Sequence, residues 1–262
     1  MKLKHFFAAI ATAFISFAVF ASNLSVYSED SPFPLVKQLA PAFDKATGHT
    51  TKLRETESVT GLANYLKQGY KPDLFFTEDT WLLSRFKDVR AQQIAIDPIV
   101  LVYLKDPGFT KDNWMQKLSK LNYGFSNPNA DPLGYYAHFI FGLYNQAHGT
   151  KFQAVSKYDR NETTDLFNLM KAGNLDVIFT YKSFAVGSKQ KFFELPAPYG
   201  LDNPNYDYSQ VSYTLKNGEK VPGHVSSFGV GIMNNRPETA AFVKFLADPK
   251  NIQSFKSLGL IQ

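Results

Sequence analysis

Cysteine is absent from the 262 residues, which excludes a disulfide scaffold, a structural zinc site built on thiolates and a cysteine nucleophile. Charge is also sparse, because charged residues make up 19% of the chain and the formal net charge is +5. No run of five or more basic residues occurs, so we expect no nucleic-acid partner. The chain does hold 24 Phe and 14 Tyr, a content that excludes disorder and allows a folded core.

Common enzyme motifs are missing as well. The sequence contains no Gly-x-Ser-x-Gly elbow, no phosphate-binding glycine loop and no His-Glu-x-x-His metal site. The five histidines are scattered along the chain, at His5, His49, His138, His148 and His224. We therefore predict a protein that is not an enzyme and that carries no cofactor.

The N-terminus holds a short apolar run. Lys2 and Lys4 precede residues 6–20, which carry no charge, and the small residue Ala21 follows them. Fifteen residues fall short of the roughly 20 that a membrane-spanning helix needs. A basic flank, a short apolar stretch and a small exit residue are typical of a secretory signal, although an anchoring helix is an alternative. We expect residues 1–21 to be a signal peptide that directs the protein to the periplasm or another extracytoplasmic location.

Strand and helix patterns alternate twice along the rest of the chain, an order typical of α/β proteins with crossover helices. Strands are expected at residues 24–28, 50–54, 73–77, 94–104 (apart from Asp97 and Pro98), 123–125, 176–180, 192–195 and 229–233, and helices at 35–46, 59–68, 81–89, 132–147, 165–172, 237–247 and 249–258. We infer two α/β lobes. The first comprises residues 22–104 and 224–262, and the second comprises residues 105–223. Ligands of such sheets bind beyond the carboxyl ends of the strands, so we expect a site between the lobes.

Four polar residues stand at these strand ends: Ser31, Ser58, Asp131 and Tyr181. Helix N-termini present unpaired backbone N–H groups and a partial positive charge, and hydroxyl groups beside them add donors. Such an arrangement could hold an oxyanion without Lys or Arg. Each Ser or Asp taken alone is better explained as a helix cap than as a ligand contact, and it is their joint placement at strand ends of both lobes that favours a site.

Several segments carry a resemblance to a known family. They are SNPNADPLGY at residues 126–135, LDVIFTYKSFAV at 175–186, FFELP at 192–196, LDNPNY at 201–206 and AFVKFL at 241–246. In these segments the chain resembles the substrate-binding proteins of molybdate and tungstate ABC transporters, especially the archaeal-type branch. The resemblance implies the two-lobed type II periplasmic-binding-protein fold, each lobe a mostly parallel sheet flanked by helices. It also implies a monomer that captures molybdate or tungstate in the cleft and delivers it to a membrane permease.

The resemblance also implies roles for individual residues. It assigns ligand contacts to Ser31, Ser58, Asp131 and Tyr181, and a direct contact with the Mo or W atom to Asp131. Where the archaeal-type branch has a glutamate eighteen residues before the tyrosine, this chain has Thr163, which we take as a fifth contact. Further candidate contacts are Glu162, Asp30, Glu57 and Leu133.

Acidic residues near the expected site leave a second function open. Glu29 and Asp30 stand where the family has small residues, and Glu57 precedes Ser58. A carboxylate 4 Å from an anion costs about 1 kcal/mol per pair of charges even in water. The alternative is therefore the same fold with an acidic cleft that binds a cation, such as Ca²⁺, Mg²⁺ or Mn²⁺, or another small solute.

Overall fold

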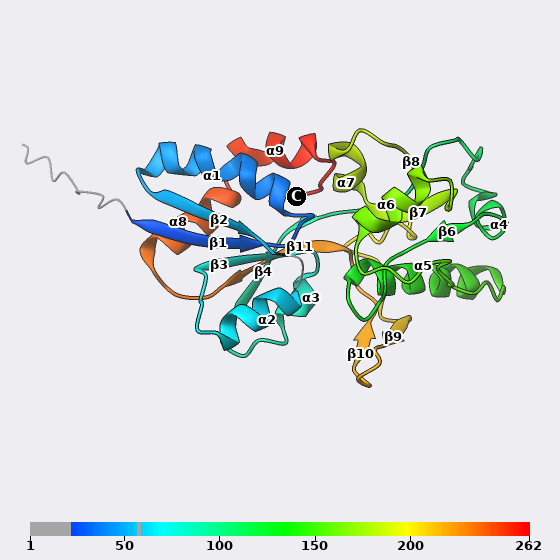
Figure 1. Cartoon of the computed structure of the whole chain (residues 1–262), viewed down its shortest axis with the longest axis horizontal. Coiled ribbons are helices and arrows are strands. Elements are labelled where there is room, and N and C mark those ends of the chain that lie inside the picture. Colours follow the sequence, from blue (N-terminus) through cyan, green and yellow to red (C-terminus); the bar gives the residue numbers. More distant parts are fainter. Residues whose placement is uncertain (1–21, 57–58) are drawn as a thin grey trace, which may run out of the picture.

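The computed structural model describes residues 22–56 and 59–262, and it contains two separate main β-sheets (Figure 1). Residues 1–21, with the expected signal peptide, and the predicted site residues Glu57 and Ser58 lie outside the described residues. The first sheet has the order β2 (Thr50–Glu55), β1 (Asn23–Ser28), β3 (Leu74–Thr77), β11 (Ser227–Ile232) and β4 (Arg90–Ile96). The second has the order β6 (Tyr123–Gly124), β7 (Val177–Tyr181), β5 (Ile99–Tyr103) and β8 (Lys191–Glu194).

Each sheet contains one strand that runs against the others. In the first sheet β11 is antiparallel to β3 and β4, whereas β1 is parallel to β2 and β3. In the second sheet β5 is antiparallel to β7 and β8, and β6 is parallel to β7. The reversed strands are those by which the chain enters the second sheet and returns to the first. The fold is therefore the expected two-lobed α/β fold with mostly parallel sheets.

The first crossing between the lobes lies at Asp97 and Pro98, earlier than the expected boundary at residue 104. Ile96 pairs with Ser227 in the first sheet, and Ile99 pairs with Tyr181 in the second, so residues 94–104 do not form one strand. Pro98 has no N–H group with which to continue a strand ladder.

Asp97 is fully buried at this crossing and accepts hydrogen bonds from the backbone N–H (3.0 Å) and hydroxyl of Ser183. Burial raises the pKa of Asp97 to about 7, against the lowering effect of those two bonds. We propose to divide the lobes here and at residues 223–226, where the chain returns.

Helices cover both sheets. In the first lobe they are α1 (Phe33–Thr47), α2 (Val59–Lys67), α3 (Thr80–Leu83), α8 (Pro237–Leu246), η1 (Pro249–Asn251) and α9 (Ile252–Ser257). In the second lobe they are α4 (Trp114–Leu118), α5 (Pro132–His148), α6 (Thr163–Lys171) and α7 (Lys182–Gly187), with a separate hairpin of β9 (Ser212–Thr214) and β10 (Lys220–Pro222). Within the parts of the chain that the structure describes, no helix has the length and apolar character to cross a membrane.

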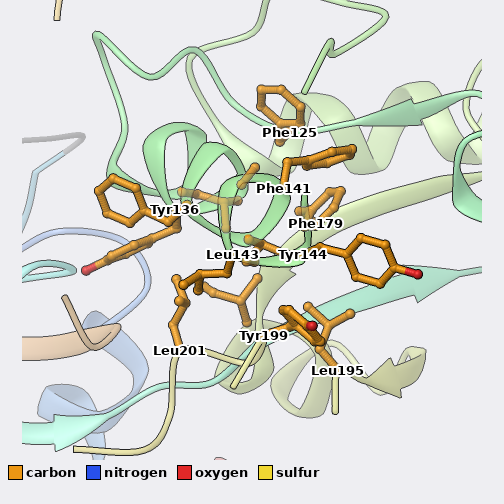
Figure 2. Packing of buried hydrophobic residues seen from close by; sticks show 14 of the residues in the cluster. Phe125, Tyr136, Phe141, Leu143, Tyr144, Phe179, Leu195, Tyr199 and Leu201 are labelled. Atoms are coloured by element: carbon orange, nitrogen blue, oxygen red, sulfur yellow. The ribbon is translucent and has the colours of Figure 1, made fainter. Parts of the chain in front are cut away.

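Helix α5 is the centre of the second lobe. Its residues Tyr136 and Phe139 are fully buried, and aromatic side chains from the sheet and from the 195–201 segment pack around it (Figure 2). Phe141 and Phe179 of β7, for example, have ring centroids 6.0 Å apart. A helix that is apolar nearly all round is stable only inside a core. This packing fixes the N-terminus of α5, which faces the first lobe.

Candidate functional site

A cleft of about 460 Å³ lies between the two lobes. The first lobe contributes the segments that follow β1 and β3, and the second contributes the N-terminal ends of α5 and α6 and the tip of the β9–β10 hairpin. The lining residues are Glu29, Asp30, Glu78, Leu82, Arg85, Pro128, Asn129, Ala130, Asp131, Pro132, Tyr135, Asn161, Glu162, Thr163, Leu215, Lys216 and Asn217. Strand ends and helix starts thus converge here, where α/β proteins bind ligands.

Four of the residues predicted to contact a ligand line this cleft: Asp30, Asp131, Glu162 and Thr163. Ser31 is not part of the lining, but its backbone N–H reaches two side chains of the cleft, Asp30 and Glu78. Leu133 is fully buried and does not line the cleft, and its backbone N–H donates to Asp131.

Two glutamates, Glu29 and Glu78, line the first-lobe side of the cleft. Glu29 directly follows β1 and is 2% exposed. Its Oε2 accepts hydrogen bonds from the Thr77 hydroxyl (2.8 Å) and from the backbone N–H of Glu78 (2.6 Å). Burial raises the pKa of Glu29 to about 8, although these bonds lower it in part. Burial also raises the pKa of Glu78, with further increases from the charges of Asp30 and Asp131.

Asp131 forms the opposite wall as the N-cap of α5. Its Oδ1 accepts a hydrogen bond from the backbone N–H of Leu133 (2.8 Å). Burial raises the pKa of Asp131 to about 7, opposed by this bond and reinforced by the charge of Asp30. Carboxyl groups from both lobes therefore share one cleft and raise one another's pKa.

Two of the backbone donors expected to bind an oxyanion are occupied by these carboxyl groups. The Ser31 N–H donates to Asp30 Oδ1 (2.9 Å) and to Glu78 Oε1 (3.3 Å), and the Leu133 N–H donates to Asp131. A ligand would have to share or take over these donors.

Tyr181 lies behind the cleft and is 1% exposed. Its ring packs against Tyr136 of α5 and Phe228 of β11, with centroids 6.4 and 6.3 Å away, so it contacts both lobes. Its hydroxyl has no hydrogen-bond partner within the described residues. Burial raises its pKa well above 10, as do the charges of Glu78 and Asp131, so the hydroxyl stays a neutral donor.

A polar contact behind the cleft joins the lobes. Asp79 caps α3 by accepting from the Trp81 N–H (2.8 Å), and it also accepts from the Tyr135 hydroxyl of α5. His224, at the second crossing, lies 2.9 Å from Asp79 through Nε2. Burial lowers the pKa of His224, but the nearby Asp79 carboxylate outweighs burial and the net shift is upward. Asp79, Tyr135 and His224 thus link α3, α5 and the second crossing between the lobes.

Sequence reasoning missed several lining residues, notably Glu78, Arg85, Tyr135 and Lys216. The rule that led to Ser31, a polar residue after a strand, applies equally to Glu78 after β3 and would have found it. No sequence signal indicated that the hairpin tip lies at the cleft.

The acidic side chains do not form a recognisable cation site. Among residues 22–56 and 59–262, no group of three or more His, Asp or Glu side chains is arranged to hold a metal ion. The described residues therefore give no support to the alternative in which the cleft binds a cation.

Comparison with known proteins agrees with the fold. An uncharacterized solute-binding protein of Petrotoga mobilis is 30% identical over 60% of this chain and 56% of its own length. The molybdate/tungstate-binding protein WtpA of Pyrococcus abyssi is 28% identical over 58% of this chain and 53% of its own length, so the chain spans about half of each. The substrate-binding domain of a putative molybdenum ABC transporter from Clostridium difficile superposes with a TM-score of 0.64 at 17% identity, covering 92% of this chain and 99% of that one.

A family profile covers almost all of the described chain. It matches residues 24–261 and is described as that of the bacterial extracellular solute-binding proteins. Both lobes and the cleft between them fall within these residues. On this match, the chain belongs to the bacterial extracellular solute-binding protein family.

Proposed function

We propose that this protein captures a tetrahedral oxyanion, molybdate or tungstate, in the interlobe cleft and delivers it to an ABC permease. The observation that carries the proposal is the cleft itself, in which strand ends of one lobe face the N-termini of α5 and α6 of the other. Similarity to a molybdate/tungstate-binding protein supports the same ligand class. In this proposal the protein is a monomeric receptor of the periplasm or cell exterior, without catalytic activity or cofactor.

The high pKa values of the glutamates make an acidic cleft compatible with an anion. With its pKa near 8, Glu29 is largely protonated at neutral pH, and the raised pKa of Glu78 acts in the same direction. A neutral carboxyl group in an apolar setting donates a hydrogen bond to an oxyanion instead of repelling it. A protonated Glu78 carboxyl group is also a weaker acceptor, so the Ser31 N–H would have to be shared between the ligand and Asp30 Oδ1 alone.

The proposed contacts come from both lobes. Ser31 and Ser58 would act from the first lobe, and Asp131, Thr163 and Tyr181 from the second. Asp131 would contact Mo or W directly in its ionised form, with Oδ1 oriented by the Leu133 N–H. The remaining candidate contacts, Glu162, Asp30 and Glu57, would lie around the anion.

Isothermal titration with molybdate, tungstate, sulfate and phosphate tests the proposal. We expect molybdate and tungstate to bind and to raise the melting temperature. An absence of heat and of any thermal shift with all four would contradict it. A rise in melting temperature with Ca²⁺, Mg²⁺ or Mn²⁺, while the oxyanions have no effect, would favour the acidic-cleft alternative instead.

Tyr181→Phe should weaken ligand binding without changing the stability of the ligand-free protein. The hydroxyl has no partner among the described residues, so its removal should barely change the free energy of unfolding without ligand. The same change should weaken molybdate binding by about 1–3 kcal/mol, because a buried hydrogen bond to a charged group is lost. Tyr123→Phe is the control, since that hydroxyl donates to the Gln153 carbonyl outside the cleft. Equal affinities of the wild type and Tyr181→Phe would remove Tyr181 from the site.

A further inference from the structure

The tip of the β9–β10 hairpin, residues 215–219, is a well-ordered turn. The Leu215 N–H donates to the Glu219 carbonyl, and the Gly218 N–H donates to the Leu215 carbonyl, both at 2.9 Å. Gly218 has a φ of 85°, a backbone conformation that glycine adopts without strain. The side chain of Asn217 accepts from the Glu219 N–H at 3.0 Å. The positions of the side chains at the tip are therefore set by the turn.

Packing fixes this hairpin tip to the second lobe. Leu215 and Val221 belong to the hydrophobic cluster around α5, and the ring of Tyr213 lies 4.5 Å from that of His138. The Lys216 N–H donates to Asn129 Oδ1 at 2.7 Å, which ties the hairpin tip to the loop that carries Asp131. These contacts join the hairpin tip to the second-lobe wall of the cleft.

The hairpin tip also reaches the first lobe. Glu219 forms an ion pair with Arg85, a residue that follows α3 and lines the cleft. The Arg85 guanidinium lies over the Trp81 ring, 5.7 Å from its centroid, so the first-lobe partner is held in place. Both charged side chains are about one-third exposed, at 34% and 33%. This ion pair spans the mouth of the cleft.

The cleft is lined by more acidic than basic side chains. The lining residues include five carboxyl groups but two cations, Arg85 and Lys216. Arg85 is paired with Glu219, whereas the Lys216 ammonium forms no ion pair with any described residue. An ammonium group is a compact charge with three donors, suited to a small oxyanion. The backbone donors of Ser31 and Leu133 already have carboxyl partners, so an added cation matters more here.

We propose that the hairpin tip completes the anion site: Lys216 supplies positive charge to the oxyanion, and the Arg85–Glu219 ion pair holds the tip across the mouth of the cleft. This inference rests on the proposed function, because it names further residues of the same site.

Calorimetric titration of molybdate into Lys216→Gln, at low and high salt, tests the first part. We expect a Kd about 10-fold weaker than that of the wild type and a smaller salt dependence, because one charge–charge interaction is lost. Lys220→Gln is the matched control, since Lys220 is exposed on the same hairpin and does not line the cleft, and its Kd should change less than about 2-fold. Circular dichroism and melting curves verify that both variants are folded.

The outcomes distinguish this inference from the function on which it rests. If the wild type binds molybdate and Lys216→Gln matches Lys220→Gln, the role of Lys216 is overturned while the function stands. If the wild type binds none of the oxyanions, the proposed function itself fails.

A double-mutant cycle tests the ion pair. Arg85→Gln and Glu219→Gln should each weaken molybdate binding about 2- to 5-fold, and the double variant should be no weaker than the worse single variant. The charge-exchanged pair, Arg85→Glu with Glu219→Arg, should recover most of the affinity. Additive losses and no recovery would overturn the role of the ion pair.

Discussion

Gly134→Ala is expected to lower the free energy of unfolding by about 2–3 kcal/mol and to disturb the cleft as well. Gly134 lies in the first turn of α5, where a Cβ atom would be 2.5 Å from the Pro128 Cα and still closer to the Pro128 N and the Ser126 carbonyl oxygen. These neighbours are backbone atoms, which cannot rotate away as a flexible side chain could. The segment that would have to shift leads directly to Asp131, so oxyanion binding should weaken too.

Urea unfolding followed by circular dichroism measures this effect, with Gly187→Ala as the control. Gly187 is the last residue of α7, its φ is not positive, and an added Cβ would meet nothing within 4 Å. Alanine favours helix over glycine by up to about 1 kcal/mol, so Gly187→Ala should leave stability unchanged or raise it. If Gly134→Ala unfolds at the same urea concentration as the wild type, the close approach of the loop to α5 is disproved.

Stability should fall as the pH rises from about 5 to about 8. A glutamate in the unfolded chain ionises near pH 4.5, whereas Glu29 in the folded protein keeps its proton up to about pH 8. Between these values the folded state binds more protons, so rising pH favours the unfolded state. Asp97 and Asp131, with pKa values raised to about 7, act in the same direction, whereas His138, whose pKa burial lowers to about 4, opposes them up to about pH 6.5. The expected loss is on the order of 2–4 kcal/mol, with full stabilisation reached below about pH 4.

Urea unfolding at a series of pH values, without ligand, checks this prediction. Glu29→Gln should flatten the profile, because the amide is neutral throughout and its oxygen can still accept from Thr77 and the Glu78 N–H. Glu55→Gln, at the exposed end of β2, is the control and should keep the wild-type slope. A free energy of unfolding that is constant or rises over this pH range would contradict the raised pKa of the cleft carboxyl groups.

Local patterns were sufficient to predict the α/β class and most elements. Helix α5, expected at residues 132–147, spans Pro132–His148, because Asp131 and Pro132 begin a helix and Gly149 ends it through local backbone preferences. The β-rich stretch expected at residues 94–104, apart from Asp97 and Pro98, is two strands, and periodicity alone could not show that they belong to different sheets. Asp97 accepts a hydrogen bond from Ser183, which is 86 residues away, so local patterns could not indicate this contact.

The sequence by itself predicted the two-lobed fold and placed Ser31 after the first strand and Asp131 at the start of a helix, because capping and periodicity act over a few neighbouring residues. Only the tertiary structure decided the charges and the hydrogen bonds of the cleft. The proton held by Glu29, the occupied Ser31 donor, the Arg85–Glu219 ion pair and the position of Lys216 all depend on burial and on contacts between distant segments. Burial and long-range electrostatics have no local sequence signature, and they set the charge of this cleft.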